Sequence, residues 1–105
     1  MEAITEPVLL ILLSLATRPR HGYAILRDTQ EISNGRVRLS TGTLYGALRR
    51  LLDDGWIERF EEEDTSRGKQ AYRLTSLGRR NLQMEVSRLK QLTRAAALRV
   101  VRKET

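Results

Sequence analysis

The side chains best suited to bind a polyanion lie close together, in the stretch that begins at Ser40. Thr41 and Thr43 carry hydroxyl groups that donate hydrogen bonds to phosphate oxygens. Tyr45 adds a phenol, and Arg49 carries a guanidinium that pairs through two hydrogen bonds with a guanine edge or a phosphate. We expect Ser40, Thr41, Thr43, Tyr45 and Arg49 to contact nucleic acid. The alternative is that they form the solvated face of an ordinary helix.

A second basic group follows in the turn-rich segment around Gly68. Arg67 and Lys69 flank this glycine, where a protruding hairpin would reach the DNA backbone or the minor groove. A plain solvated turn is the competing interpretation. The acidic run Glu61–Asp64 lies in the preceding strand and repels phosphate, so a minor-groove role is the weaker prediction.

Composition narrows the class of protein. The chain has 105 residues and a formal net charge of +6. Residues 65–105 hold eleven Lys or Arg against two Asp or Glu, and this local excess favours a nucleic-acid partner. The chain has no cysteine, one histidine and no phosphate-binding glycine loop, so we expect no metal, no cofactor and no enzyme activity.

The elements that must position these groups can be read from apolar spacing and turn residues. A first helix is expected from Thr5, with Pro7 in its first turn; it is apolar almost all round, which predicts burial on several sides, partly by a partner chain. Thr17–Arg20 is expected to be a loop. The longest apolar run, which starts at Val8 and ends at Ala16, is far too short to span a membrane, which needs about 20 residues, and we expect a cytoplasmic protein.

Two further helices are expected at about 21–33 and 41–54. The first has Ile25, Thr29 and Ile32 on one face and stops at Asn34-Gly35. The second is capped by Ser40 and closed by Gly55. Its core face is predicted to comprise Leu44, Leu48, Leu51 and Leu52.

Two strands at about 56–62 and 69–75 form a predicted hairpin, followed by a long helix from Thr75 or Ser76 to about Arg102. Apolar or small residues recur along this helix at alternating steps of four and three, which predicts a dimer seam. The seam residues are Leu82, Val86, Leu89, Thr93, Ala96 and Val100. Arg79 and Arg80 in its first turn face either phosphate or solvent. The fold class is therefore mainly α with a small β-hairpin: a winged helix-turn-helix plus a C-terminal dimerisation helix.

Several segments together resemble the PadR family of transcriptional regulators. They are His21-Gly22-Tyr23, the run Ser40 to Tyr45, Leu48-Arg49-Arg50-Leu51, Asp54-Gly55-Trp56-Ile57, and Tyr72-Arg73-Leu74-Thr75 with Gly78. Ala71 stands where the family often has an aromatic residue.

The resemblance implies a homodimeric repressor that binds double-stranded DNA, with a DNA-binding domain at 1–75 and a dimerisation helix at 76–105. A two-fold dimer implies an inverted-repeat operator. The sequence does not identify a small-molecule effector; Trp56 is expected to fill the core rather than line an effector cavity.

Two other functions remain open. The basic C-terminal helix fits a membrane-surface protein, although its seam narrows to Thr93 and Ala96 where such helices carry large apolar residues. A protein-interaction winged helix without DNA binding is the second, and Arg49-Arg50 argue against it.

Overall fold

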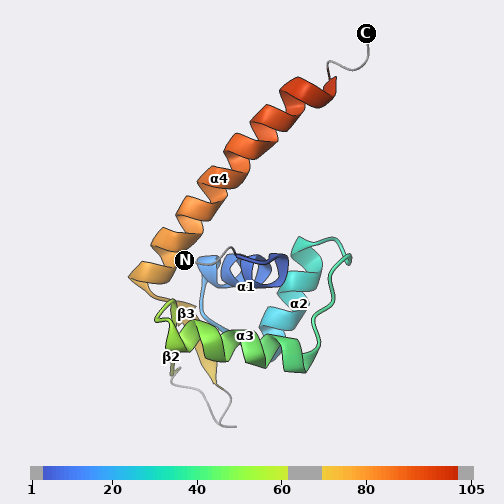
Figure 1. The fold of residues 1–105 in the computed structure, drawn as a ribbon. Coiled ribbons are helices and arrows are strands. Elements are labelled where there is room, and N and C mark those ends of the chain that lie inside the picture. Colours follow the sequence, from blue (N-terminus) through green and yellow to red (C-terminus); the bar gives the residue numbers. More distant parts are fainter. Residues whose placement is uncertain (1–3, 62–69, 102–105) are drawn as a thin grey trace.

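The computed structural model describes residues 4–61 and 70–101 of the chain. The elements follow in the order α1 (Glu6–Thr17), β1 (Arg20–His21), α2 (Gly22–Ile32), α3 (Thr41–Asp53), β2 (Ile57–Phe60), β3 (Ala71–Leu74) and α4 (Ser76–Val101). Figure 1 shows α1, α2 and α3 packed into one body, with the strands at one end and α4 running away from it. The molecule is therefore elongated, measuring 61 × 28 × 22 Å. This arrangement confirms the predicted fold class.

The expected start and stop signals shape the helices. Thr5 caps α1, and Ser40 caps α3 by accepting a hydrogen bond from the Thr43 N–H at 3.1 Å. The chain leaves α2 through Asn34 and Gly35, whose φ angles are 56° and 79°, and it leaves α3 through Gly55 at φ 78°. Left-handed backbone of this kind is cheap for glycine and tolerable for asparagine.

The sheet has one strand more than the predicted hairpin. In place of the expected loop and helix start, Arg20 and His21 form β1, and they pair antiparallel with Tyr72 and Ala71 of β3. The other edge of β3 pairs with β2, so that the strand order is β1-β3-β2. Two residues are too few to show the alternation of apolar and polar side chains that marks a strand in a sequence. They form a strand only because the free edge of β3 lies beside them.

The core lies between the first three helices and the sheet. Its members are Ile11, Leu12, Leu15, Ile25, Leu44, Ala47, Leu48, Leu51, Ile57, Tyr72, Leu74 and Leu82. Most predicted core positions of α2 and α3 are confirmed, but Ile32 is 41 % exposed and Leu52 is half-buried. Ile32 is the last residue of α2, where the chain turns away from the body.

The nearly all-apolar α1 is buried largely by its own chain. Leu10, Ile11, Leu12, Ser14 and Leu15 are buried within the single molecule, where α1 contacts α2, β3 and α4. The predicted burial on several sides is confirmed within one chain, while the expected partial cover by a partner chain stays a prediction. Half-buried Leu9, Leu13 and Ala16 remain accessible in one chain.

The C-terminal end of α1 is held by arginines from outside the helix. Its last turn has no basic residue of its own. Arg20 donates from Nε to the Ser14 carbonyl at 2.9 Å, and Arg79 of α4 donates from Nη1 to the Ala16 carbonyl at 3.3 Å. Cations at these carbonyls complement the negative end of the helix dipole. Arg79 is thus engaged within the chain.

The root of α4 is locked to the end of α3. Thr75 donates from its hydroxyl to the Gly55 carbonyl at 2.6 Å and accepts from the Gly78 N–H at 3.1 Å. Gly78 lies so close to the Trp56 carbonyl that a Cβ at this position would overlap the oxygen. A glycine is therefore required for α4 to leave the body in this direction.

Candidate nucleic-acid interface

The polar side chains of α3 lie opposite its core face. Leu44, Leu48 and Leu51, spaced i, i+4 and i+7, are buried. The residues spaced the same way on the opposite face are Gly42, Gly46 and Arg49, and all three are exposed. Thr41, Thr43, Tyr45 and Arg50 are exposed as well. The predicted residues of α3 are thus all exposed, and we call the exposed part of α3 from Thr41 to Arg50 the α3 face.

The start of the α3 face is ordered by Ser40. Its hydroxyl oxygen accepts a hydrogen bond from the Thr43 N–H. Its hydroxyl group also donates a hydrogen bond to Thr43 Oγ1, with an oxygen–oxygen distance of 3.0 Å. Ser40 is thus occupied as a helix cap, while the Thr43 hydroxyl keeps its own hydrogen for an outside acceptor. Sequence reasoning grouped Ser40 with the contact residues; its position is that of a residue that orients Thr43.

The middle of the α3 face is bare backbone. Gly42 and Gly46 are four residues apart and thus lie on the same side of the helix. A Cβ at Gly46 would meet no described atom within 4 Å, and one at Gly42 would meet the Ser40 hydroxyl at 3.9 Å. We call these two glycines the bare strip. Glycine inside a helix costs about 0.5–1 kcal/mol relative to alanine, and packing within the described chain gives no reason for that cost.

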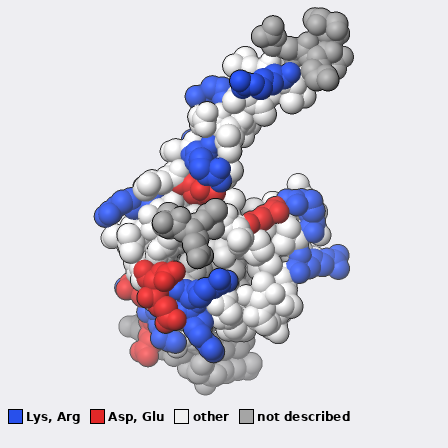
Figure 2. Space-filling view, viewed as in Figure 1, with Lys and Arg blue, Asp and Glu red and all other residues white. Residues whose placement is uncertain are grey.

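The charges around the α3 face are mixed. Arg49 and Arg50 form no ion pair with another described residue, so their guanidinium groups are available to an outside anion. On the surface seen in Figure 2, basic side chains lie low on the body with acidic ones beside them. Further exposed acids follow the arginines at Asp53 and Asp54. A polyanion would therefore be steered toward the first three turns of α3 rather than its end.

The second predicted DNA-contacting element is the connection between β2 and β3. Phe60 of β2 lies opposite Ala71 of β3, so residues 61–70 connect the strands. Arg67 and Lys69 lie outside the described residues, as do most of the acidic residues before them. Within the sheet, Arg73 pairs with Glu58 at 2.7 Å and covers the Phe60 ring at 4.7 Å.

The six predicted seam residues of α4 divide into two groups. Leu82 is buried in the core of its own chain, and Val86 packs against it. Leu89 is half-buried, whereas Thr93, Ala96 and Val100 are exposed. Sequence reasoning missed the exposed Leu92, which lies three residues from Leu89 and four from Ala96. The heptad count started at Leu82 and passed over it in favour of Thr93.

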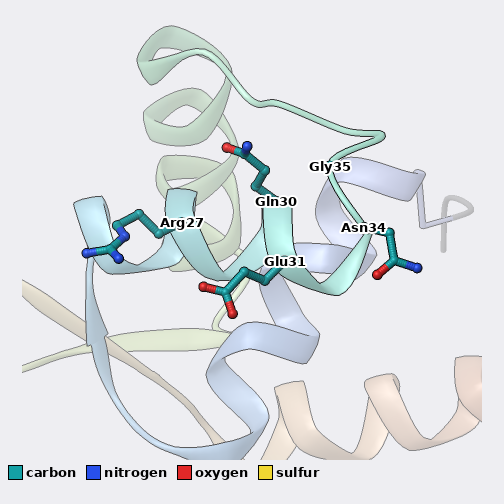
Figure 3. A pocket seen from close by; sticks show the side chains of 5 residues that line it. All are labelled: Arg27, Gln30, Glu31, Asn34 and Gly35. Carbon is teal, nitrogen blue, oxygen red and sulfur yellow. The ribbon is translucent and has the colours of Figure 1, made fainter.

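A hollow at the end of α2 was not predicted. It is lined by Arg27, Gln30, Glu31, Asn34 and Gly35. Figure 3 shows their side chains pointing in different directions rather than toward one centre. Trp56 is not among these residues; it is half-buried against the core.

Neither a metal-binding cluster nor a membrane-spanning helix is present among the described residues. The described residues contain no group of three or more acidic or histidine side chains placed to hold a metal ion. None of the described helices is both long and apolar enough to cross a membrane.

Residues 11–84 match the model of the transcriptional regulator PadR-like family. The chain belongs to this family. The matched residues begin in α1, include the whole α3 face and end in the third turn of α4. Members of the PadR-like family are transcription regulators, and the match accounts for the three helices, the sheet and the root of α4.

Two curated relatives are longer than the stretch they share with this PadR-like chain. A transcriptional regulator of Mycobacterium tuberculosis is 38 % identical over 66 residues, which are 63 % of this chain and 62 % of the relative. An uncharacterised 37.1 kDa protein in transposon TN4556 of Streptomyces fradiae is 36 % identical over 85 residues, 81 % of this chain but 23 % of that protein. The chain thus spans less than two thirds of either relative.

Solved structures agree on the PadR-like fold. A PadR family transcription regulator from Clostridium difficile superposes with a TM-score of 0.75 at 23 % identity, covering 90 % of this chain and 97 % of that one. Bacillus subtilis PadR in complex with operator DNA superposes with a TM-score of 0.65 at 25 % identity, covering 74 % of this chain and 45 % of that one.

Proposed function

We propose that this PadR-like regulator binds double-stranded DNA in a sequence-specific manner, as a homodimer, and represses transcription from an inverted-repeat operator. The observation that carries the proposal is the bare strip of Gly42 and Gly46 at the middle of an otherwise polar α3 face. Exposed glycines weaken a helix, yet they allow its backbone to come close to another molecule. The neighbouring structure of Bacillus subtilis PadR contains operator DNA, which supports the same partner class.

Each residue of the α3 face has a role that its chemistry allows. Thr41 and Thr43 donate hydrogen bonds to phosphate, helped by the positive end of the helix dipole. Tyr45 and Arg49 enter the major groove, where all four base pairs differ in their donor and acceptor patterns. Ser40 orients Thr43. Arg67 and Lys69, which lie outside the described residues, contact the DNA backbone or minor groove.

In this proposal residues 1–75 form the DNA-binding domain, and residues 76–105 form the homodimer contact. Between Lys90 and Val100 each residue of α4 except Ala95 is exposed in the single chain, with Leu92, Leu98 and Val100 among them. Leu92 and Val100 lie on the side of α4 that carries the predicted seam residues Leu89 and Ala96, and a second copy of the helix would cover them. A two-fold dimer presents two α3 faces, so half-site centres are expected about 10 bp, or a multiple of this, apart.

Selection of bound sequences from random duplex DNA tests the proposal directly. We expect an inverted repeat, and footprints that protect both half-sites. Recovery of no preferred sequence, or stoichiometric protection of a lone half-site, would contradict it.

The roles of α3 and of the predicted wing can be separated on the selected operator. Arg49→Ala is expected to cost about 1–3 kcal/mol on the operator and less on random DNA, because it removes a base contact. Lys69→Ala is expected to weaken both DNAs alike and to lower the salt slope by about one phosphate contact per protomer. Arg99→Ala, a change of the same charge at the far end of α4, is the control. If Lys69→Ala alone reduces specificity, α3 is not the element that reads the sequence.

A further inference from the structure

Gly22, the first residue of α2, lies directly against the Tyr45 side chain of α3. A Cβ at residue 22 would overlap the Tyr45 hydroxyl oxygen and would lie 2.9 Å from Cζ and 3.4 Å from Cε1. These are the three nearest atoms, and all of them belong to Tyr45. The phenol of Tyr45 therefore occupies the space that a side chain at residue 22 would fill.

The sheet determines where this seat lies. Because Arg20 and His21 pair with Tyr72 and Ala71, α2 begins beside β3. Burial raises the pKa of the Tyr72 phenol, and the nearby Tyr45 phenol raises it further, while Arg59 lowers it. The Tyr45 phenol thus lies near both the start of α2 and Tyr72 of β3.

The Tyr45 ring is nevertheless not buried. It is 48 % exposed, so one part of the ring rests on Gly22 while the rest remains on the α3 face. The contact with Gly22 restricts the rotation of the Tyr45 side chain before any ligand arrives. A freely rotating tyrosine would lose that freedom on binding, at a cost equivalent to about 2- to 12-fold in affinity.

We propose that Gly22 is a positioning residue for DNA recognition: by leaving room for the phenol, it fixes the Tyr45 ring on the α3 face in the orientation that meets DNA. This inference rests on the proposed function, since it assigns to Gly22 a share in the specificity of the α3 face. Gly22 itself is buried, so it would act on DNA binding through the Tyr45 ring.

Gly22→Ala is a clean test because alanine suits this position in every other respect. Gly22 has no left-handed φ, so alanine adopts its backbone without strain, and alanine is the better helix former. The overlap is with the far end of a partly exposed side chain, which relieves it by rotating away. We therefore expect Gly22→Ala to fold with an unchanged or higher Tm and to displace the Tyr45 ring.

The experiment compares wild type, Gly22→Ala, Tyr45→Ala and the double variant. Helical content and Tm are measured for all four, and each is titrated with the selected operator and with a random duplex. Gly22→Ala is expected to weaken operator binding about tenfold, with less effect on random DNA. In the Tyr45→Ala background the same substitution is expected to change neither affinity, because no ring is left to displace. A purely structural role would give the same loss in both backgrounds.

A separate readout follows the ring without DNA. In protein labelled with ¹³C-tyrosine, a cross-peak between the Tyr45 ring and the Gly22 α-protons is expected in wild type, and a changed Tyr45 ring shift in Gly22→Ala. If wild type selects no duplex sequence, both the proposed function and this inference are wrong, whatever the ring shows. If wild type binds its operator but Gly22→Ala binds it equally well, unfolds, or loses the same affinity without Tyr45, the inference alone is overturned.

Discussion

Glycines and the side chains beside them decide most of the local chemistry. On α3 the bare strip is bordered by Tyr45 and Arg49, and at the start of α2 the missing Cβ of Gly22 gives Tyr45 its seat. The bare strip allows another molecule to approach α3, and Gly22 restricts the movement of the Tyr45 ring. Both sacrifice helix propensity, so both invite substitution by alanine as a test.

Replacing Gly46 by alanine is expected to separate stability from binding. The methyl group meets open space within the described chain and gains helix propensity, so unfolding should require up to about 1 kcal/mol more free energy. The same methyl would project into a closely approaching DNA groove, and we expect roughly tenfold weaker operator binding, equivalent to about 1.4 kcal/mol. Thermal unfolding and DNA titration measure the two effects.

A Gly46→Ala protein that is more stable and binds the operator as tightly as wild type would show that DNA does not approach the bare strip.

At the level of elements, the connections between helices rely on a few polar contacts. The segment between α2 and α3 is tied to the start of α1 by an ion pair between Arg36 and Glu6. The hydrogen bond from Arg36, together with its charge, lowers the pKa of the Glu6 carboxyl. Both side chains are well exposed, so the stabilisation is small and sensitive to salt.

The pH dependence of this pair has a definite sign. Because the folded pKa of Glu6 lies below its ordinary value of 4.5, the stabilisation is complete above that value and is lost as the pH falls through the lower, folded pKa. Arg36→Gln is thus expected to be less stable than wild type at pH 7, and the difference is expected to shrink as the pH falls below 4.5. Urea unfolding over a series of pH values measures the difference.

Arg38→Gln is the matched control, because Arg38 lies in the same segment and makes no ion pair with the described residues. A stability gap for Arg36→Gln that does not shrink as the pH falls below 4.5, or an equal gap for Arg38→Gln, would exclude the ion pair as its source.

The helices and the α3 face were predictable because their signals are local. Ser40, Gly55 and the spacing of Leu44, Leu48 and Leu51 act within one or two turns. β1 was not predictable, since only the edge of β3, some fifty residues later, makes Arg20 and His21 a strand. The same applies to the contact between Gly22 and Tyr45, and to Leu82, whose heptad position gave no sign that the core would take it.

At the scale of the whole molecule, the root of α4 and its outer part have different environments. Leu82 and Val86 belong to the core, and Gly78 fixes the direction in which the helix leaves. The family match ends at residue 84, so the outer part lies beyond it. Figure 1 shows this part extending clear of the body.

The proposed seam is best tested on the exposed part of α4, where a substitution leaves the core intact. Ala96→Arg places a cation in the seam of each protomer, and we expect the dimer to weaken by about tenfold or more, since like charges would be brought together during burial. Ala97→Arg on the same turn is equally exposed but lies off the seam, and it should leave association unchanged. Sedimentation velocity over a dilution series compares them.

Equal sedimentation of both variants and wild type would place the dimer contact elsewhere. The half-buried residues of α1, Leu9 and Leu13, would then be the next surface to substitute.

The exposure of α4 beyond Leu89 affects how the occupancy of DNA would depend on the concentration of this protein in a cell. Short isolated helices are marginal in water, so in a lone chain the outer turns would fray, and pairing must supply the free energy that orders them. In the proposed dimer, that coupling would make the association weaker than its contact area alone would give. At low copy number the chains would separate and lose part of their helix, and DNA occupancy would rise more steeply than in proportion to protein concentration. Pairing through the projecting helix would then set a threshold concentration, below which the protein is present but leaves its DNA site unoccupied.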